Sequence, residues 1–260
     1  MPLTLCVVAS GSSGNCIYVA SATTRVLVDA GLSGRETQRR LGELGIDPGG
    51  LHAICVTHEH ADHRAGLPAL HQRHGVKLYA NAGTIDAIEH ESARGVLAWE
   101  VFTTGVPFMV GDLRIEPFPV PHDSYDPVGF VVSNGNSRVG LVTDMGMATA
   151  VVRERLKNCH AVVMESNHDE EMLRNSSRPW SLKQRILGRQ GHLSNAQAAE
   201  LLTEIAWPEM RYVFLAHISE DCNRPEVALT VMRRALTAAG HPQVDVKLTY
   251  GDRASELVMV

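Results

Sequence analysis

The sequence predicts an α/β protein, on two observations. Short apolar runs rich in β-branched residues, typical of buried strands, alternate along the chain with amphipathic segments that are typical of helices. Several of these runs end in an aspartate, a glutamate or a histidine, so polar groups recur at the ends of predicted strands. The chain has 260 residues, of which 44% are hydrophobic and 20% charged. It is therefore long enough to bury a large core, with the composition of an ordinary globular protein.

A series of apolar runs bounded by Gly, Asn or Asp is predicted to form the strands. The tripeptide Asn-Gly-Asn at 134–136 has the composition of a tight turn, so we expect the runs on either side of it to pair as a hairpin. The predicted strands span residues 3–8, 16–20, 25–29, 53–57, 76–80, 113–118, 128–133, 138–144, 161–165, 212–216 and 244–249.

Capping signals predict the helices. One helix follows the capping box that Ser33 and Glu36 can form, and a second follows the capping box of Ser194 and Gln197. A third begins at Pro225, because proline suits the first turn of a helix, and it ends before the next glycine.

The two halves of the chain resemble each other. The segments LVDAG and LVTDMG both end a strand in an aspartate, Asp29 or Asp144, followed by a glycine turn. The segments CVTHEH and FLAHIS both end a strand in a histidine. This repetition suggests a duplicated sheet unit, with halves at about 1–120 and 121–260 and a site where they join. No Pro/Ser-rich linker separates the halves, so we expect a single domain over 1–260.

Composition and charge limit the possible classes of function. The formal net charge of −5 gives no overall sign of nucleic-acid binding, so a basic surface would have to be local. A nuclease stays open, because bound divalent cations would offset carboxylates in its site. The five cysteines include no C-x-x-C pair, which favours buried thiols in a reducing cytosol. With no signal-peptide pattern and no apolar run near the ~18 residues that cross a bilayer, we expect a cytoplasmic protein that does not bind membranes.

Four side chains that bind metals fall within the segment THEHADH, directly after a predicted strand. A metal ion needs several deprotonated ligands about 2.0–2.2 Å from one point, and a tight loop after a rigid strand can supply them. Alternation in an extended segment points His58 and His60 in the same direction, toward one ion. Asp62 and His63, which follow after the chain turns, can bind a second ion.

The H-x-H-x-D-H pattern of this segment resembles the signature of the metallo-β-lactamase superfamily, and the resemblance extends over nearly the whole chain. It implies a four-layer αββα sandwich with the metal site at one end, between the two β-sheets. Later positions of the superfamily pattern match PVPHDSYD, LVTDMG and LAHIS. The implied ligands form two sets joined by a bridging carboxylate: His58, His60 and His122 for one ion, Asp62, His63 and His217 for the other, and Asp144 between them.

The resemblance also implies roles next to the metals. Asp29 matches the superfamily's first acidic motif and is expected to orient a ligand, not to be one. Asp62 is expected to take part in catalysis as well as in metal binding. The cofactor would be two divalent ions, Zn²⁺ or Mn²⁺ before Fe²⁺, since sites of His and Asp suit all three.

The second half of the chain indicates which bond is broken. Glu165 ends a predicted strand, and His192 stands directly before a capped helix in GHLSNAQAA. This arrangement resembles the transfer-RNA 3′-processing endonucleases, in which the histidine lies near the scissile phosphate and the glutamate keeps it protonated. The helix start supports this role, because its free N–H groups and positive dipole end favour phosphate.

Several further segments resemble the bacterial YycJ/WalJ group, among them SGSSGN, ESNHD, PWSLKQRILGRQGHLSN and LAHISEDCN. That resemblance implies a two-metal 5′→3′ exonuclease that acts on DNA, more than on RNA, with a possible role in DNA repair. A small-molecule hydrolase of the same fold, such as a lactonase, thioesterase or cyclic-phosphate diesterase, is the alternative. It would need the same metals but neither Glu165 nor His192. The oligomeric state is left open.

Contacts with the substrate are assigned more loosely. The serines of GSSGN could bind phosphate or merely form a turn, and the basic segment before His192 could contact DNA or be a solvated surface. His168 could relay protons or be a polar residue at a strand end. The residues proposed to contact substrate are Ser12, Ser13, Asn15, His168, Trp180, Lys183, Arg185, Ser194 and Asn195.

Overall fold

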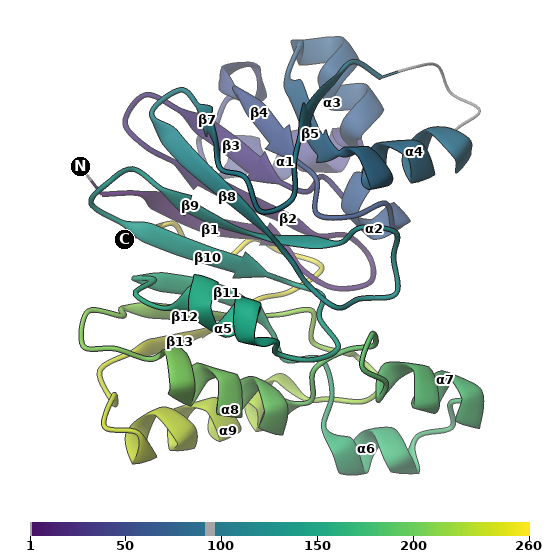
Figure 1. Ribbon diagram of the computed structural model, residues 1–260, viewed down its shortest axis with the longest axis vertical. Coiled ribbons are helices and arrows are strands. Elements are labelled where there is room, and N and C mark those ends of the chain that lie inside the picture. The colour runs from purple at the N-terminus through teal and green to yellow at the C-terminus, as the bar shows by residue number, and fades with distance from the viewer. Residues whose placement is uncertain (1, 92–96) are drawn as a thin grey trace.

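The computed structural model describes residues 2–91 and 97–260, and it has four layers (Figure 1). Two β-sheets pack face to face, and helices cover the outer face of each. Sheet A contains, in spatial order, β14 (Val258–Met259), β1 (Thr4–Ala9), β2 (Cys16–Ala20), β3 (Arg25–Val28), β4 (Ala53–Cys55), β5 (Lys77–Asn81) and β6 (Trp99–Phe102). Sheet B contains β13 (Asp245–Leu248), β12 (Tyr212–Ala216), β11 (Ala161–Glu165), β10 (Arg138–Val142), β9 (Val128–Ser133), β8 (Leu113–Pro119) and β7 (Phe108–Val110). The predicted αββα sandwich is confirmed.

The central core lies between the two sheets. Alternate residues of each strand point to the same face, so Val7 and Val19 of sheet A meet Phe130, Leu141 and Val163 of sheet B. All five side chains are buried. Burial of each contributes about 1.5–3 kcal/mol, so this shared core joins the sheets and fixes how their edges face each other.

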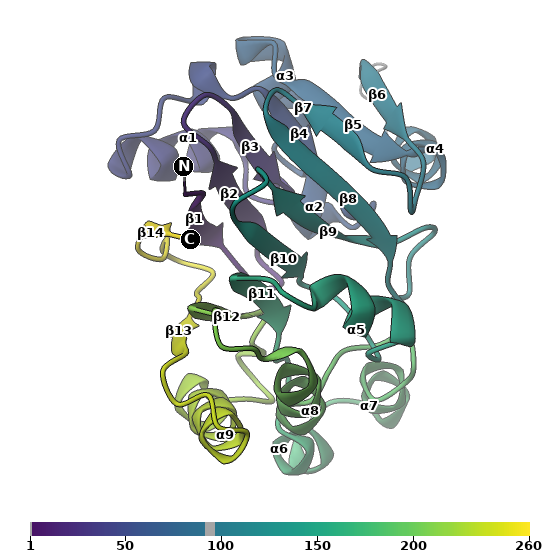
Figure 2. The same cartoon turned by 60° about the vertical axis from the view of Figure 1, so that its left-hand side comes forward.

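Helices form two outer cores. Sheet A is covered by α1 (Gly34–Glu43), α3 (Leu67–His74) and α4 (Ala82–Glu91), and sheet B by α5 (Ala150–Leu156), α8 (Asn195–Ile205) and α9 (Pro225–Ala238) (Figure 2). The remaining short helices are η1 (Pro48–Gly50), α2 (Ala61–Arg64), α6 (Glu170–Asn175) and α7 (Trp180–Ile186). Within the described ranges, no helix combines the length and the apolar character needed to cross a bilayer.

The parallel part of each sheet determines where polar residues collect. Strands β3 to β6 run parallel in sheet A, and β10 to β13 run parallel in sheet B. The carboxyl ends of parallel strands lie at the same edge of a sheet, where α/β proteins place their ligands. Glu165 ends β11 at this edge, and the loops there carry Asp29, His58, Asp144 and His217.

The predicted strands are present with ends that agree within one or two residues, and β9 and β10 pair as the expected hairpin. The sequence did not predict β6, β7 and β14, which are short strands at or near the sheet edges whose exposed residues hide the alternation. The three predicted helices correspond to α1, α8 and α9. The helices between α1 and α8 were not predicted, because most are too short for a clear period.

Candidate metal centre and active site

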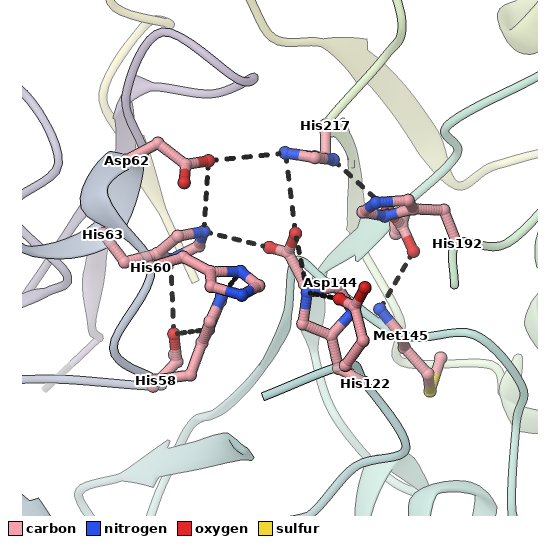
Figure 3. Close-up of polar contacts among 12 residues, drawn as sticks. His58, His60, Asp62, His63, His122, Asp144, Met145, His192 and His217 are labelled. Carbon is pink, nitrogen blue, oxygen red and sulfur yellow. Dashed lines mark hydrogen bonds and ion pairs between the residues drawn. The ribbon is translucent and has the colours of Figure 1, made fainter. Parts of the chain in front are cut away.

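The loop after β4 presents a cluster of ligand atoms (Figure 3). His58 lies in the extended segment after the strand, and His60 is the N-cap residue of α2. Asp62 and His63 lie in the first turn of this helix. His58 Nε2 is 3.0 Å from His60 Nδ1, so these two rings direct ring nitrogens toward the same point.

His122 completes the first group. It lies in the loop between β8 and β9, and one of its ring nitrogens lies within 4.8 Å of those of His58 and His60. Its Nδ1 is 3.2 Å from the carbonyl oxygen of Gly191. A carbonyl only accepts, so Nδ1 carries the proton and donates it, which leaves Nε2 free to face the other two rings.

Asp144 lies between this group and a second one. Its Oδ1 is 4.0 Å from His122 Nε2 and 3.5 Å from His217 Nε2, and its Oδ2 is 3.3 Å from His63 Nε2. Asp62 Oδ2 lies 3.5 Å from His63 Nε2 and 3.7 Å from His217 Nε2. The two sets of side chains are therefore adjacent, with the Asp144 carboxylate between them (Figure 3).

The chemistry of this donor set fits divalent metal ions. Imidazole and carboxylate ligands suit Zn²⁺, Mn²⁺ and Fe²⁺. Two ligand atoms, Asp144 Oδ2 and His217 Nε2, are buried without a hydrogen-bond partner among the described residues, and such atoms are costly unless a ligand satisfies them. Burial disfavours a charged ring, yet the carboxylates of Asp144, Asp62 and Glu165 raise the pKa of His217 to about 10. A cation would take the place of that proton.

Asp29 and Thr57 hold two of the rings in place. Asp29 Oδ1 accepts a hydrogen bond from the Thr57 N–H at 2.8 Å, and Oδ2 accepts from the Thr57 hydroxyl at 2.9 Å and from His63 Nδ1 at 2.7 Å. The Thr57 hydroxyl in turn lies 2.9 Å from His58 Nδ1, which can donate to it. Both rings thus carry their proton on Nδ1 and present Nε2 to the site, the usual arrangement for histidine ligands.

Backbone strain is concentrated at the same place. Asp29 and His217 have φ values of 62° and 52°. These values lie in the left-handed region of the backbone, which residues other than glycine seldom adopt. Strain of this kind costs about 1–3 kcal/mol and persists where the surroundings impose it, often at functional sites. The His217 N–H donates to Ser10 Oγ at 2.8 Å, which helps to hold this conformation.

Glu165 links two histidines with different surroundings. Its Oε1 lies 2.6 Å from His192 Nδ1 and 3.3 Å from His217 Nδ1, and its Oε2 accepts from the N–H groups of Met145 and Leu193 at 3.0 Å. Burial opposes ionisation of both partners. Their mutual attraction nevertheless lowers the pKa of Glu165 and raises the pKa of His192. The contact therefore favours a carboxylate on Glu165 and a protonated ring on His192, beside Asp144 and His217.

Close backbone approaches place His192 there. A methyl group on Gly146 would lie 2.4 Å from the carbonyl oxygen of Arg189 and 2.5 Å from the Gly191 nitrogen. The loop after β10 therefore packs directly against the segment that precedes His192. Ser194 then begins α8 with the predicted capping box, in which its hydroxyl accepts from the Gln197 N–H.

The structure separates the residues proposed to contact substrate into two sets. Ser12 and Ser13 are exposed, and with Arg185 they line a cavity beside His192 and His217; Trp180 is exposed as well. The other five are buried, with at most 9% of their surface exposed. They are Asn15, His168, Lys183, Ser194 and Asn195.

Their hydrogen bonds give the physical reason. Asn15 Nδ2 donates to Asp62 Oδ2 at 3.1 Å, so this residue positions a ligand. Lys183 Nζ donates to the carbonyl oxygens of Arg174 and Ser176, both at 2.7 Å, and ties α6 to α7. Asn195 bonds with Ser166 and Asn223, and the ring nitrogens of His168 have no partner among the described residues.

The cavity beside the site has a volume of about 860 Å³. The residues that line it include His192, His217, Tyr250 and Arg253. Arg253 lies over the Tyr250 ring at 3.6 Å from its centre. A space of this size lies within the range of small-ligand sites, so it can accept a group as large as a nucleotide.

Some residues of the site were missed from the sequence. Thr57 carries the contact between Asp29 and His58, and Asn167 Nδ2 donates to the His217 carbonyl oxygen at 2.8 Å. Their positions directly before His58 and two residues after Glu165 were the only signal. Neither residue type is specific enough to be recognised without the fold.

Comparison with known proteins identifies the family. A family model described as "Beta-lactamase superfamily domain" matches residues 24–218. The chain is 37% identical to exodeoxyribonuclease YycJ of Bacillus anthracis, over 92% of this chain and 91% of that protein. It is 36% identical to exodeoxyribonuclease WalJ of Streptococcus pneumoniae, over 90% of this chain and 88% of that protein. The metallo-β-lactamase fold protein YhfI of Bacillus subtilis superposes with a TM-score of 0.74 at 15% identity, over 98% of this chain and 100% of the other.

The chain therefore belongs to the metallo-β-lactamase superfamily and, within it, to the family that contains YycJ and WalJ. It is a metal-dependent hydrolase. The membership and the enzyme class predicted from the sequence are both confirmed.

Proposed function

We propose that this protein is a two-metal nuclease that hydrolyses DNA as a 5′→3′ exonuclease, with a role in DNA repair. The observation that carries the proposal is the His192–Glu165 pair at 2.6 Å, held beside the metal-binding cluster and at the border of the 860 Å³ cavity. A thioester, or an ester with a good leaving group, needs no such acid. The alkoxide that leaves a phosphodiester does need one.

The choice of DNA is supported by the two relatives, which are both exodeoxyribonucleases and which align with about nine-tenths of this chain. We assign one ion to His58, His60 and His122 and the other to Asp62, His63 and His217. Asp144, which approaches rings of both sets, would be a ligand common to the two. When bound, such a pair of Zn²⁺ or Mn²⁺ ions supplies an activated water and stabilises charge on the phosphate oxygens.

The protein's own groups perform the proton transfers. Glu165 accepts from His192 Nδ1, so the proton that His192 can give away is the one on Nε2. His192 Nε2 would deliver this proton to the leaving 3′-oxygen, and Glu165 would keep the ring charged until that moment. Asp62, held by Asn15 between His63 and His217, would orient the attacking water.

One observation favours the alternative of a small-molecule hydrolase. The cavity lining contains more carboxylates than guanidinium groups, and the chain has a net charge of −5. A nucleic-acid strand carries many phosphates and gains little binding energy from such a surface. A small substrate does not need a basic surface. Of these small substrates, a thioester differs from DNA in its need for a general acid, because a thiolate leaves without a proton and an alkoxide does not.

The test is His192→Ala with two substrates under Mn²⁺. Turnover of DNA should fall by about 10²–10⁴-fold, because the alkoxide must be protonated. Turnover of bis(4-nitrophenyl) phosphate should fall much less, since nitrophenolate leaves without a proton. Metal content should stay the same, and His90→Ala, in an exposed position on α4, serves as the control. Equal loss with both substrates, or no loss with DNA, would remove the general acid from the proposal.

A further inference from the structure

A row of polar and basic residues crosses sheet B at the end opposite the metal centre. Arg114 of β8 pairs with Ser133 of β9, and Ser133 pairs with Arg138 of β10. The row continues beyond β10, because the His160 N–H donates to the Arg138 carbonyl oxygen and the Arg211 N–H donates to that of His160. These residues therefore stand at one level, on or just before the strands β8 to β12.

The strand residues of this row point to the outer face of the sheet. Successive side chains of a strand alternate between faces, and residues paired across strands share one face. Ile115, Val132 and Val139, which follow the strand residues of the row directly or precede one of them, point into the core between the sheets. Arg114 and Arg211, at the two ends of the row, are exposed, so the row is accessible to a large ligand.

Positive charge is in excess at one end of the row. Glu116, which is buried on β8, contacts three guanidinium groups. Its Oε1 lies 3.3 Å from Arg138 Nη1 and also contacts Arg114, and its Oε2 lies 3.3 Å from Arg155 Nη1 of α5. Three positive charges against one negative charge leave an excess of two, and the carboxylate has no capacity to offset them.

The other end of the row adds one cation and one anion. The guanidinium group of Arg211 has no ion-pair partner among the described residues, and Glu209 Oε2 lies 3.7 Å from His160 Nε2. Burial lowers the pKa of His160, and the charges of Arg211 and Arg138 lower it further against the attraction of Glu209. The ring therefore stays neutral, and the excess of two positive charges over the whole row remains.

The spacing of the arginines favours a long polyanion over a single phosphate. Neighbouring strands lie about 4.8 Å apart, so arginines on every second strand are about 10 Å apart and the row is about 19 Å long. A small anion reaches one such group, whereas a chain of phosphates reaches several and releases counterions at each. Only Ser133 and His160 stand between the arginines, so the row lacks the apolar core of a typical protein–protein interface.

We propose that this basic row binds the phosphate backbone of DNA as a second contact, separate from the catalytic site. The choice of DNA among polyanions rests on the proposed nuclease function. The row supplies the local basic surface that a chain with a net charge of −5 needs for such a ligand. Strand β10 leads from Arg138 toward Asp144, six residues and about 20 Å away, which is the length of about six base pairs. A longer DNA molecule is thus held at the row while the metal centre acts on its end.

The experiment measures binding of a fluorescent dumbbell duplex by anisotropy at several salt concentrations, under Mn²⁺. Its closed ends offer no 5′ end to an exonuclease. Arg114→Ala and Arg211→Ala should each lower the slope of log K against log salt by about 0.9, and the double variant by about 1.8, since each phosphate contact contributes about 0.9. Arg114→Lys and Arg211→Lys keep the charge and should keep the slope. Arg35→Ala, exposed on α1 over sheet A, is the matched control.

A small substrate and a second polyanion complete the test. The double variant should turn over bis(4-nitrophenyl) phosphate as the wild type does, because this molecule is too short to reach the row. An unchanged salt slope in the double variant would overturn the DNA contact. Tighter binding of polyglutamate than of the dumbbell would also overturn it and would assign the row to an acidic protein segment. If the slope falls as expected but the wild type hydrolyses no nucleic acid, the proposed nuclease function fails and the second contact stands.

Discussion

Glu165 acts on two neighbours at once. One carboxylate oxygen contacts both His192 and His217, and the other is fixed by two backbone N–H groups from different loops. Removing its charge would therefore affect the proton on His192 and the orientation of a proposed metal ligand together. These two effects can be separated, because the first changes the pH profile of activity and the second changes the metal content.

Glu165→Gln should move the alkaline limb of the activity profile to lower pH. The carboxylate raises the pKa of His192 against the effect of burial, and the ring is active when protonated, so activity is lost as pH rises through that pKa. Without the charge this pKa falls, and DNA turnover near neutral pH should drop by roughly tenfold or more. The check is a pH profile of kcat with metal content measured alongside. An unshifted limb would show that Glu165 does not control the proton.

Asp144 and Asp62 should differ in their effect on metal content. Asp144 approaches rings of both ligand sets, whereas Asp62 approaches only His63 and His217. Asp144→Ala should therefore lose both ions, and Asp62→Ala should keep part of the metal. Elemental analysis after purification measures the ratio of metal to protein. Asp86→Ala, exposed on α4, should match the wild type, and equal loss in the two site variants would contradict the bridging role.

At the scale of the element, the loop after β10 has room for one residue type at position 146. A Cβ there would collide with backbone atoms of the segment 189–191, which cannot give way as a flexible side chain would. The position of His192 relative to Asp144 therefore depends on this glycine.

Gly146→Ala should displace His192 and reduce DNA turnover, with a stability loss of about 1–3 kcal/mol from overpacking. Both ions should remain, because the ligands of the loop after β4 are not touched. Urea unfolding, turnover and metal content give the three readouts. Gly42→Ala is the matched control, since a Cβ at this position in α1 meets nothing within 4 Å and alanine favours a helix. Full activity of the Gly146 variant would mean that the contact is not needed.

At the scale of the whole molecule, the metal centre joins the two sheets. Its side chains come from loops of sheet A and of sheet B, and only the folded chain brings them together. Buried carboxylates and imidazoles without a cation between them are a source of instability.

Chelation should therefore lower the thermal unfolding temperature. Ions bound only to the folded state stabilise it by about 2.7 kcal/mol when present at 100 times their dissociation constant. Differential scanning calorimetry with and without a chelator measures the shift, and added Mn²⁺ or Zn²⁺ should reverse it. Asp144→Ala should unfold at the same temperature with and without the chelator. An unfolding temperature of the wild type that does not change with the chelator would contradict a metal centre that joins the sheets.

The sequence determined the features that depend on neighbouring residues. The spacing within THEHADH brings His58, His60, Asp62 and His63 onto one loop in any fold that ends a strand there. The strand pattern and the capping box of Ser194 are equally local, because a period of two and a hydrogen bond across one turn are properties of a short segment.

Only the tertiary structure decided which distant groups meet. The basic character of Lys183 suggested a DNA contact, but the fold buries it against the carbonyls of α6. Tyr125 carried no signal in the sequence, yet the fold exposes its ring and bonds its backbone N–H to Glu59 of the metal-binding segment. The second contact of Glu165, to His217, was likewise invisible. Burial and exposure depend on how two sheets and their loops pack, and packing is set by the sum of contacts between segments far apart in the chain.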